Sequence, residues 1–385
     1  MIGRPQGCGK SKILSLQSTT DWQDLFARCA PGQAGTTATL YGIRRGGAPW
    51  LLLPAGRVLA SQSLALYPAQ TGRARAAKSL LQFALSIGLK PRLEKIKLVV
   101  AADDAFANFL CQTARLPTGT LPRFALLAGN PHGPGRRFVL LLFGADGQPA
   151  TVVKAGVSEA AKQLIVTEAQ FLQTAPPGFP GLPKLRGLFE ARSLRAFALD
   201  FHDGSSPAGD STKKLGELLS AWLRPEQPVT LGQLGAWRRL VESGSESLLP
   251  GALAPLAAVR VLPALSHGDF APWNVKVSRG QWTVLDWERG ELAGVPGWDW
   301  FHFVIQPAVL VRHEHTDASI SKFERLLTSA EFLRYARRAG IGEHGRALAL
   351  AYLAYCTRVT LQTEGRDQMR ALERAAAERW FPEEC

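Results

Sequence analysis

The segment from residue 266 to residue 299 constrains this chain more than any other. It reads HGDFAPWN, then an apolar run that ends in LDWE, then a proline-glycine turn into WDW. Asp269 and Asn274 lie five residues apart on a loop that Pro272 keeps from becoming helical, because proline lacks the backbone N–H that a helix needs. Asp286 ends the apolar run, so its carboxylate is predicted to emerge from a strand end beside that loop. The segment therefore predicts a cluster of carboxylate and amide oxygens on neighbouring loops.

Oxygen ligands of this kind suit Mg²⁺, which takes one or two carboxylates together with phosphate oxygens. Phosphoryl transfer from a nucleotide also needs a group that holds the attacking hydroxyl, because such a site mainly positions reactants and neutralises charge. Asp269 fits the hydroxyl-holding role, and Asn274 and Asp286 fit the role of metal ligands. The alternative is a chance His-Gly-Asp turn before an ordinary strand, and order and spacing across more than thirty residues argue against it.

This segment resembles the aminoglycoside phosphotransferase and choline kinase family, the small-molecule branch of the protein-kinase-like fold. Members carry His-Gly-Asp, four residues, Asn, a hydrophobic strand, and then Asp with an aromatic residue and often Glu. The matching residues here are His267, Gly268, Asp269, Asn274, Asp286, Trp287 and Glu288. The resemblance implies that Asp269 is the catalytic base and that Asn274 and Asp286 bind magnesium. It also implies supporting roles for His267, Glu288 and Asp299. Asp299 would brace the catalytic loop, and Glu288 would be a second acidic residue near the metal.

A kinase-like chain also needs a strand lysine and a glutamate on the next helix, upstream of the catalytic loop. RRFVLLLFGADG followed by QPATVVKAG predicts two strands joined by a turn at residues 144–147, the second ending at Lys154. Apolar residues then recur at helical spacing, with Ser158 as the predicted N-cap. Glu168 is the predicted partner of Lys154. Glu159 lies in the first turn of the helix, where its negative charge interacts favourably with the helix dipole. An exposed lysine and a surface glutamate are the plain alternative.

The phosphate-covering loop is the weakest match to a kinase. Its place holds AGNPHGPGRR, where glycines permit close backbone approach to phosphates. Pro131 and Pro134 remove N–H groups that such a loop would donate. Gly133 and Gly135 are the predicted nucleotide contacts of this loop.

The predicted fold class is α+β, a two-lobed protein-kinase-like fold with an additional N-terminal extension. The predicted units are an α+β extension of unknown role at 1–120, a β-rich small lobe at 121–200, and a helical large lobe at 201–385 with the catalytic and metal-binding loops. In the extension, TATLYGI, WLLLPA, ASQSLALYP and KIKLVVAA are predicted strands, and residues 73–87 a helix. The basic residues of that helix are predicted to form a plain solvated face: Arg73, Arg75 and Lys78.

The net charge of +13, from 45 basic and 32 acidic residues, favours an anionic partner, which nucleotide and phosphate satisfy. The basic residues are dispersed, so no nucleic-acid partner is expected, while a peripheral contact with an anionic surface stays open. Five scattered cysteines and no apolar segment of membrane-spanning length predict a cytoplasmic protein. His313 and His315 flank Glu314 at a spacing that predicts a polar helix end rather than a metal site.

The predicted function is enzymatic: transfer of the γ-phosphoryl group of ATP, with Mg²⁺, to a hydroxyl of a small molecule such as a sugar or amino sugar. A Ser/Thr protein kinase is disfavoured, because WERGELAGVPGWDW follows the metal aspartate with no room for an activation loop. A nucleotide-binding pseudokinase that scaffolds partners is the other alternative. Polycationic aminoglycosides would call for an acidic pocket, whereas this chain is strongly basic.

Overall fold

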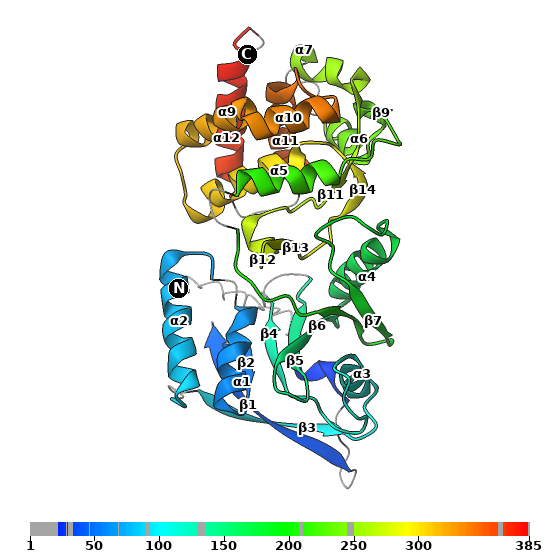
Figure 1. Cartoon of the computed structure of the whole chain (residues 1–385), viewed down its shortest axis with the longest axis vertical. Coiled ribbons are helices and arrows are strands. Elements are labelled where there is room, and N and C mark those ends of the chain that lie inside the picture. The colour runs from blue at the N-terminus through cyan, green and yellow to red at the C-terminus, as the bar shows by residue number, and fades with distance from the viewer. Residues whose placement is uncertain are drawn as a thin grey trace, which may run out of the picture.

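The computed structural model describes residues 22–27, 29, 34–45, 47–67, 69–89, 93–129, 135–207, 211–244, 250–360 and 365–383. The chain forms a sheet-rich part and a helical part that follow one another along the long axis of the molecule (Figure 1). This arrangement confirms the predicted α+β class and its division into a β-rich and a helical lobe.

A single antiparallel sheet of eight strands runs through the first part in the order β3-β1-β2-β4-β5-β6-β8-β7. Its strands are β1 (Gly35–Arg45), β2 (Ala48–Pro54), β3 (Glu94–Ala101), β4 (Phe124–Ala128), β5 (Phe138–Phe143), β6 (Pro149–Gly156), β7 (Leu185–Glu190) and β8 (Arg195–Asp200). The strands of the predicted extension and of the predicted small lobe join where β2 pairs with β4, at Leu51 with Leu127 and Leu52 with Leu126. The predicted boundary at residue 120 therefore falls between strands of one continuous sheet.

Helices cover both faces of this sheet, which explains why the central strands read as unbroken apolar runs, FALLA and FVLLLF. On one face, Phe106 and Leu110 of α3 (Ala105–Thr113) share a buried cluster with residues of β1, β2, β4 and β5. On the other face lie α1 (Arg57–Ser63), α2 (Gly72–Ser86) and α4 (Glu159–Thr174). The packing of α4 on β6 and β8 brings its inner face close to Lys154.

Most elements of the sheet-rich part follow the prediction, and one does not. The strands over TATLYGI, WLLLPA and KIKLVVAA, the helix α2, and the hairpin of β5 and β6 are present, although β6 continues to Gly156, past Lys154. The strand predicted over ASQSLALYP is wrong, because this segment belongs to α1 and the 3-10 turn η2 (Leu64–Leu66). Its buried residues Ala60 and Leu64 lie four apart, a helical spacing that a short apolar run hides.

The second part is built from helices around a large apolar core. They are α5 (Thr212–Ala221), α6 (Gly235–Glu242), α7 (Pro250–Leu253), α8 (Trp298–Gln306), α9 (Thr316–Thr328), α10 (Ala330–Ala339), α11 (Gly345–Arg358) and α12 (Arg366–Trp380). The pattern FERLLTSAEFLRYARRAG is divided at Ser329, whose Oγ accepts a hydrogen bond from the Phe332 backbone N–H and caps α10. No described helix is long and apolar enough to span a bilayer.

Three short antiparallel pairs complete the helical part: β9 (Val229–Thr230) with β10 (Arg260–Val261), β11 (Ala264–Ser266) with β14 (Glu291–Gly294), and β12 (Val275–Ser278) with β13 (Gln281–Val284). Figure 1 shows β12 and β13 on the side of the helical part that faces the sheet. The loop between β11 and β12 carries Asp269, and the loop after β13 carries Asp286. Both loops therefore lie at the junction of the two parts.

Candidate active site

Lys154 joins the two parts of the molecule. Its Nζ donates to both carboxylate oxygens of Glu168, at 2.6 and 2.8 Å, and also to Oδ1 of Asp286. Burial lowers the pKa of Lys154, but Asp286 and Glu168 outweigh burial and raise it, so the ammonium group stays charged. The predicted pairing of Lys154 with Glu168 is confirmed, and Glu159 instead pairs with Lys162 at the exposed start of α4.

Glu168 is wholly buried at α4 and holds a second element besides Lys154. Its Oε1 accepts a hydrogen bond of 3.1 Å from the backbone N–H of Trp287, the residue after Asp286. The helix α4 begins as predicted, since Ser158 Oγ accepts from the Ala161 backbone N–H. The position of α4 therefore fixes both Lys154 and the loop that presents Asp286.

Asp286 adopts a backbone conformation that side chains other than glycine rarely take, with φ of 67°. Desolvation raises the pKa of its carboxyl, but the ammonium of Lys154, helped by Arg137 and His267, brings the pKa down to about 2. Its side chain keeps 44% of its surface exposed. Asp286 is therefore an ionised and accessible oxygen ligand held in a strained loop.

Backbone hydrogen bonds to Asp299 fix the start of the catalytic loop. Asp299, in the first turn of α8, accepts from the N–H of His267 at 2.7 Å and from the N–H of Gly268 at 3.1 Å. The His267 ring lies 2.7 Å from the carbonyl oxygen of Leu285 through Nε2, while its Nδ1 accepts from the N–H of Asp269. His267 therefore links the Asp269 loop to the Asp286 loop, and Asp299 braces it as predicted.

The turn at Gly268 requires glycine. Its φ is 73°, and a Cβ there would approach the carbonyl oxygen of Arg289 to 2.8 Å. A larger residue would therefore push the catalytic loop away from the segment that follows Asp286.

Asn274 connects Asp269 to the predicted metal site. Its Nδ2 donates to the carbonyl oxygen of Asp269 at 2.8 Å and to Oδ2 of Asp269 at 3.2 Å. The 3-10 turn η6 (Pro272–Asn274) places it there, and its own carbonyl oxygen accepts from the N–H of Leu285, next to Asp286. Because the amide nitrogen is used in these bonds, the amide oxygen of Asn274 is the atom available to bind a metal ion.

The structure adds two residues that the sequence analysis missed. Nε2 of His302 on α8 lies 3.0 Å from Oδ1 of Asp269, and Nδ1 of His302 lies 3.1 Å from the hydroxyl of Tyr352 on α11. A Tyr352 hydroxyl that donates to Nδ1 leaves a proton on Nε2, which then donates to the carboxylate. A sequence signal existed, since His302 follows Asp299 by one helical turn and both therefore face the catalytic loop.

His302 sets the charge of Asp269. Burial raises the pKa of the Asp269 carboxyl, but the hydrogen bond from His302 and its electrostatic interaction with the carboxylate, with further contributions from Arg289 and His267, outweigh burial and lower it below its usual value. A carboxylate of this kind stays ionised and is a weak proton acceptor. Asp269 is therefore suited to orienting a hydroxyl group more than to removing its proton early.

Three predicted site residues remain: Glu288, Gly133 and Gly135. Glu288 forms an ion pair with Arg137, which lies just before β5, so it bridges the two parts beside Asp286. A Cβ on Gly135 would meet Cδ1 of Leu164 on α4 at 2.5 Å, so Gly135 packs closely against that side chain. Gly133 lies outside the described residues. Metal support by Glu288 and phosphate contacts by the two glycines stay predictions.

The oxygen donors of Asn274 and Asp286 suit magnesium, and they do not form a site in which protein side chains alone surround a metal ion. Among the described residues, no three His, Cys, Asp or Glu side chains are grouped to hold a metal ion. Mg²⁺ does not require such a group, because it is usually bound by one or two carboxylates together with substrate phosphates and water. The carboxylate of Asp286 and the amide oxygen of Asn274 are oxygen donors of that type.

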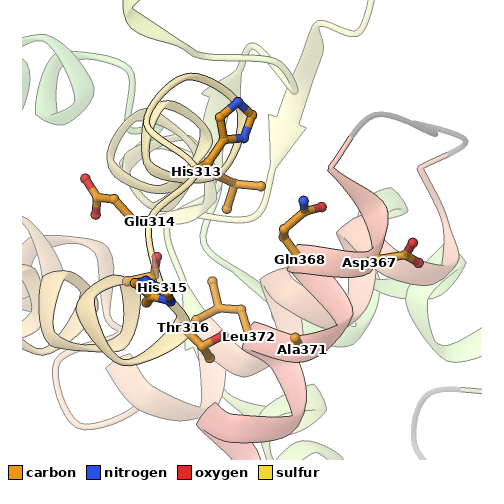
Figure 2. A pocket seen from close by; sticks show the side chains of 10 residues that line it. His313, Glu314, His315, Thr316, Asp367, Gln368, Ala371 and Leu372 are labelled. Carbon is orange, nitrogen blue, oxygen red and sulfur yellow. The ribbon is translucent and has the colours of Figure 1, made fainter.

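The His313 to His315 segment forms the connection into α9, with His315 as the residue before its first turn, as the predicted polar helix end requires. It lines a cavity of about 380 Å³ together with Asp367 and Gln368 of α12 (Figure 2). Figure 2 shows Glu314 directed away from α12, and its carboxylate pairs with Arg312 and Lys322. The carboxylate of Glu314 is therefore engaged by two cations.

No family model and no curated protein matches the chain. Many solved structures are similar to it, and three represent them. A thermostable mutant of an aminoglycoside phosphotransferase, in a ternary complex with ADP and hygromycin B, is 14% identical, with 71% of this chain and 97% of that chain covered and a TM-score of 0.43. A glucosamine kinase is 15% identical, with 76% and 89% covered and a TM-score of 0.38.

The third, a protein named as a fructosamine-3-kinase from Haemophilus somnus 129PT, is 12% identical, with 70% of this chain and 96% of that chain covered and a TM-score of 0.41. At these identities and TM-scores the similarity carries no conclusion about function, which is inferred below from the residues of the site.

Proposed function

We propose that this protein is an ATP-dependent phosphotransferase of the protein-kinase-like type, which moves the γ-phosphoryl group to a hydroxyl of a small molecule such as a sugar or amino sugar. One observation carries the proposal. Lys154 on the sheet contacts both Glu168 on α4 and Asp286, a residue 132 positions later in the chain, next to the loop that holds Asp269. Cation, metal ligands and hydroxyl-holding carboxylate, the parts that phosphoryl transfer needs, thus meet at one place.

In this proposal each side chain has a defined task. Lys154, kept charged and oriented by Glu168, binds nucleotide phosphate oxygens and neutralises part of their charge. The amide oxygen of Asn274 and the carboxylate of Asp286 hold magnesium, which supplies further neutralisation of phosphate charge when bound. Asp269 accepts a hydrogen bond from the acceptor hydroxyl and aligns its oxygen with the γ-phosphorus.

The proposed reaction is a displacement at the γ-phosphorus of ATP. A bond forms between the acceptor oxygen and the γ-phosphorus, while the bond from that phosphorus to the β,γ-bridging oxygen breaks and ADP leaves. The hydroxyl proton passes to Asp269 late in the transfer, as its lowered pKa requires, and then to solvent.

The test is transfer of the γ-phosphoryl group of radiolabelled ATP to fractionated pools of sugars, amino sugars and metabolites. We expect one or more fractions to be labelled by the wild-type protein with Mg²⁺ and none by Asp269→Asn. Nucleotide binding without transfer to any fraction would contradict the proposal and favour a pseudokinase. Labelling of serine or threonine in proteins, with no small molecule labelled, would favour a protein kinase.

A further inference from the structure

A large cavity lies between α2 and the helical part. Its volume is about 1100 Å³, enough for a ligand of sugar size or larger. One wall is the N-terminal half of α2, which in Figure 1 reaches toward the helical part. The opposite wall includes Pro272 and Trp273, which follow Asp269 on the catalytic loop, and Phe303, which follows His302. Asp269 itself does not line the cavity, which reaches the catalytic loop at Pro272 and Trp273, three and four residues after it.

The cavity is separate from the nucleotide phosphate site of the proposed function. Lys154, Asn274 and Asp286 are not among the described residues that line it. A ligand in this cavity would thus approach Asp269 from another side than the nucleotide, as an acceptor must.

The charged residues that line the cavity are all basic. They are Arg75, Lys78, Lys276, Arg312, Lys322 and Arg325, and no Asp or Glu lines it within the described part of the chain. Arg312 and Lys322 share the carboxylate of Glu314, which lies outside the lining. Arg75, Lys78, Lys276 and Arg325 form no ion pair with a residue that the structure describes, so their charges are available to a ligand.

Two of these cations lie near one another from different parts of the molecule. Lys78 on α2 donates to the carbonyl oxygen of Tyr67 at 3.0 Å, and Lys276 lies on β12. Burial, and then the charge of Lys276, lower the pKa of Lys78. Burial also lowers the pKa of Lys276, against the opposing effect of Asp203. An anion between the two ammonium groups would relieve this repulsion.

The neutral part of the lining suits a molecule with several hydroxyl groups. Hydroxyl donors and acceptors come from the segment between β8 and α5 and from the first residue of α5: Ser205, Ser206, Ser211 and Thr212. Trp273 and Phe303 add aromatic surface on the catalytic-loop side. Polar groups of this kind fix the orientation of a ligand in an otherwise apolar pocket.

We propose that this cavity binds the acceptor and that the acceptor is anionic: a sugar or polyol that already carries a phosphate or carboxylate group. Arg75, Lys78 and Lys276 hold the anionic group, and a hydroxyl of the same molecule is presented to Asp269. This inference rests on the proposed function and specifies its substrate class. It also gives the N-terminal extension a role, since α2 supplies two of the three cations of the anion site.

The sequence analysis predicted a plain solvated face for the basic residues of α2. Arg73 and Arg75 are exposed, as that prediction requires, while Lys78 is half-buried, and both Arg75 and Lys78 line the cavity. The outward side of α2 is apolar, with Leu80, Phe83 and Ile87 each more than half exposed. An anionic headgroup at a lipid surface is therefore a second source of the same chemistry as a free sugar phosphate.

The experiment compares matched probes in the full-length protein by isothermal titration calorimetry. The soluble probes are glucose 6-phosphate, glucuronate and glucose, and the lipid probes are vesicles of phosphatidylcholine with and without phosphatidylglycerol. The variants are Lys276→Gln and Arg75→Gln, and the matched control is Lys97→Gln, which removes one exposed lysine from β3, away from the cavity. Magnesium-ATP is titrated into each protein in parallel.

We expect at least one anionic probe to bind about tenfold or more tightly than its neutral counterpart, with this preference lost in Lys276→Gln and Arg75→Gln and kept in Lys97→Gln. A preference for glucose 6-phosphate or glucuronate identifies a soluble acceptor, and one for phosphatidylglycerol a lipid headgroup. Equal binding of anionic and neutral probes, or a preference that survives both cavity variants, overturns the inference. If the wild-type protein shows the anion preference but does not bind magnesium-ATP, the proposed function is overturned instead.

Discussion

The carboxylate of Asp269 is held on both oxygens, by His302 on Oδ1 and by Asn274 on Oδ2. The first contact keeps the group ionised, and the second ties it to a predicted metal ligand. His302 is therefore a positioning residue, since it acts through Asp269.

Replacing His302 tests this arrangement. In His302→Leu, Oδ1 of Asp269 loses its donor, so the pKa of Asp269 rises. As the pH is lowered, the variant should therefore lose activity at a higher pH than the wild type, because its Asp269 carboxylate is protonated at a higher pH. Loss of a hydrogen bond to a charged group, worth about 1.5–3 kcal/mol, predicts a fall in kcat of roughly tenfold or more.

The matched variant is His302→Gln, whose amide can still donate to Asp269. The pH profile of kcat/KM is the measurement, and the glutamine variant should recover part of both the rate and the acidic limb. An acidic limb that does not move in His302→Leu would show that His302 has only a structural role.

The sequence predicts a contact between two residues when both lie on neighbouring elements of the chain, and it misses contacts that depend on tertiary packing. Lys154 and Glu168 are separated by a turn and part of one helix, so a strand followed by a helix was enough to pair them. His302 and Asp269 are 33 residues apart, and their contact depends on how α8 packs under the loop. Tyr352 lies on yet another helix, so no local pattern announces it.

At the scale of elements, the Lys154–Glu168 pair attaches α4 to β6 in a buried place. Removal of one partner of a buried ion pair costs about 3–5 kcal/mol, because the other charge is left uncompensated. We expect Lys154→Met and Glu168→Gln each to lower the free energy of unfolding, and the double variant to be less destabilised than the sum.

Urea unfolding of this double-mutant cycle gives the coupling energy. The control cycle uses Lys162→Met and Glu159→Gln on the same helix, where the Glu159 side chain is 91% exposed. Exposed pairs contribute about 0.2–1 kcal/mol, so the control coupling should be small. Similar coupling energies in the two cycles would contradict the account of α4.

The catalytic loop offers a second test at this scale, through its glycine. Gly268→Ala places a methyl group against the carbonyl oxygen of Arg289 at positive φ. Gly280→Ala has nearly the same φ, 77°, but its methyl group meets no described atom within 4 Å. We expect Gly280→Ala to lose about 1–2 kcal/mol of stability from φ alone, and Gly268→Ala to lose more and to lose turnover.

Thermal unfolding and kcat of the two variants decide this point. Equal losses of stability in both, with activity kept in Gly268→Ala, would show that the close approach to Arg289 has no role.

Element prediction from sequence was reliable for periodic segments and weak where the periodicity is short. The helices α2 and α4 were found from apolar spacing and, for α4, from its Ser158 cap. The segment ASQSLALYP is apolar for too few residues to separate a strand from a helix, and tertiary packing of Ala60 and Leu64 decided it.

At the scale of the whole molecule, one buried cluster joins described residues from both sides of position 120 across the sheet. Trp22, Leu40 and Leu98 from before residue 120 lie in one buried cluster with Phe124 and Phe138 from after it. Sequence could not predict this continuity, because the β2–β4 contact joins residues near 52 and 126 with the helices α1, α2 and α3 and the strand β3 between them. The division into an extension and a small lobe at residue 120 stays a prediction.

The shared core predicts that β1, β2 and β3 open together with β4, β5 and β6. In native-state hydrogen exchange under increasing urea, amides of both sets of strands should reach the same opening free energy. The helices α11 and α12 serve as the comparison, since they belong to another core cluster. Opening of β1 to β3 at a distinctly lower free energy would show that the extension is a separate unit.

The central claim is that Lys154, Asn274 and Asp286 form one magnesium–nucleotide site beside Asp269. The most direct measurement is calorimetric titration of ATP, with Mg²⁺ and with EDTA, into the wild-type protein, Asp286→Asn and Asp269→Asn. The account predicts tight binding to the wild type with Mg²⁺ only, loss of that magnesium dependence in Asp286→Asn, and near wild-type binding in Asp269→Asn. Magnesium-dependent binding that is unchanged in Asp286→Asn, or no ATP binding by the wild type, would contradict it.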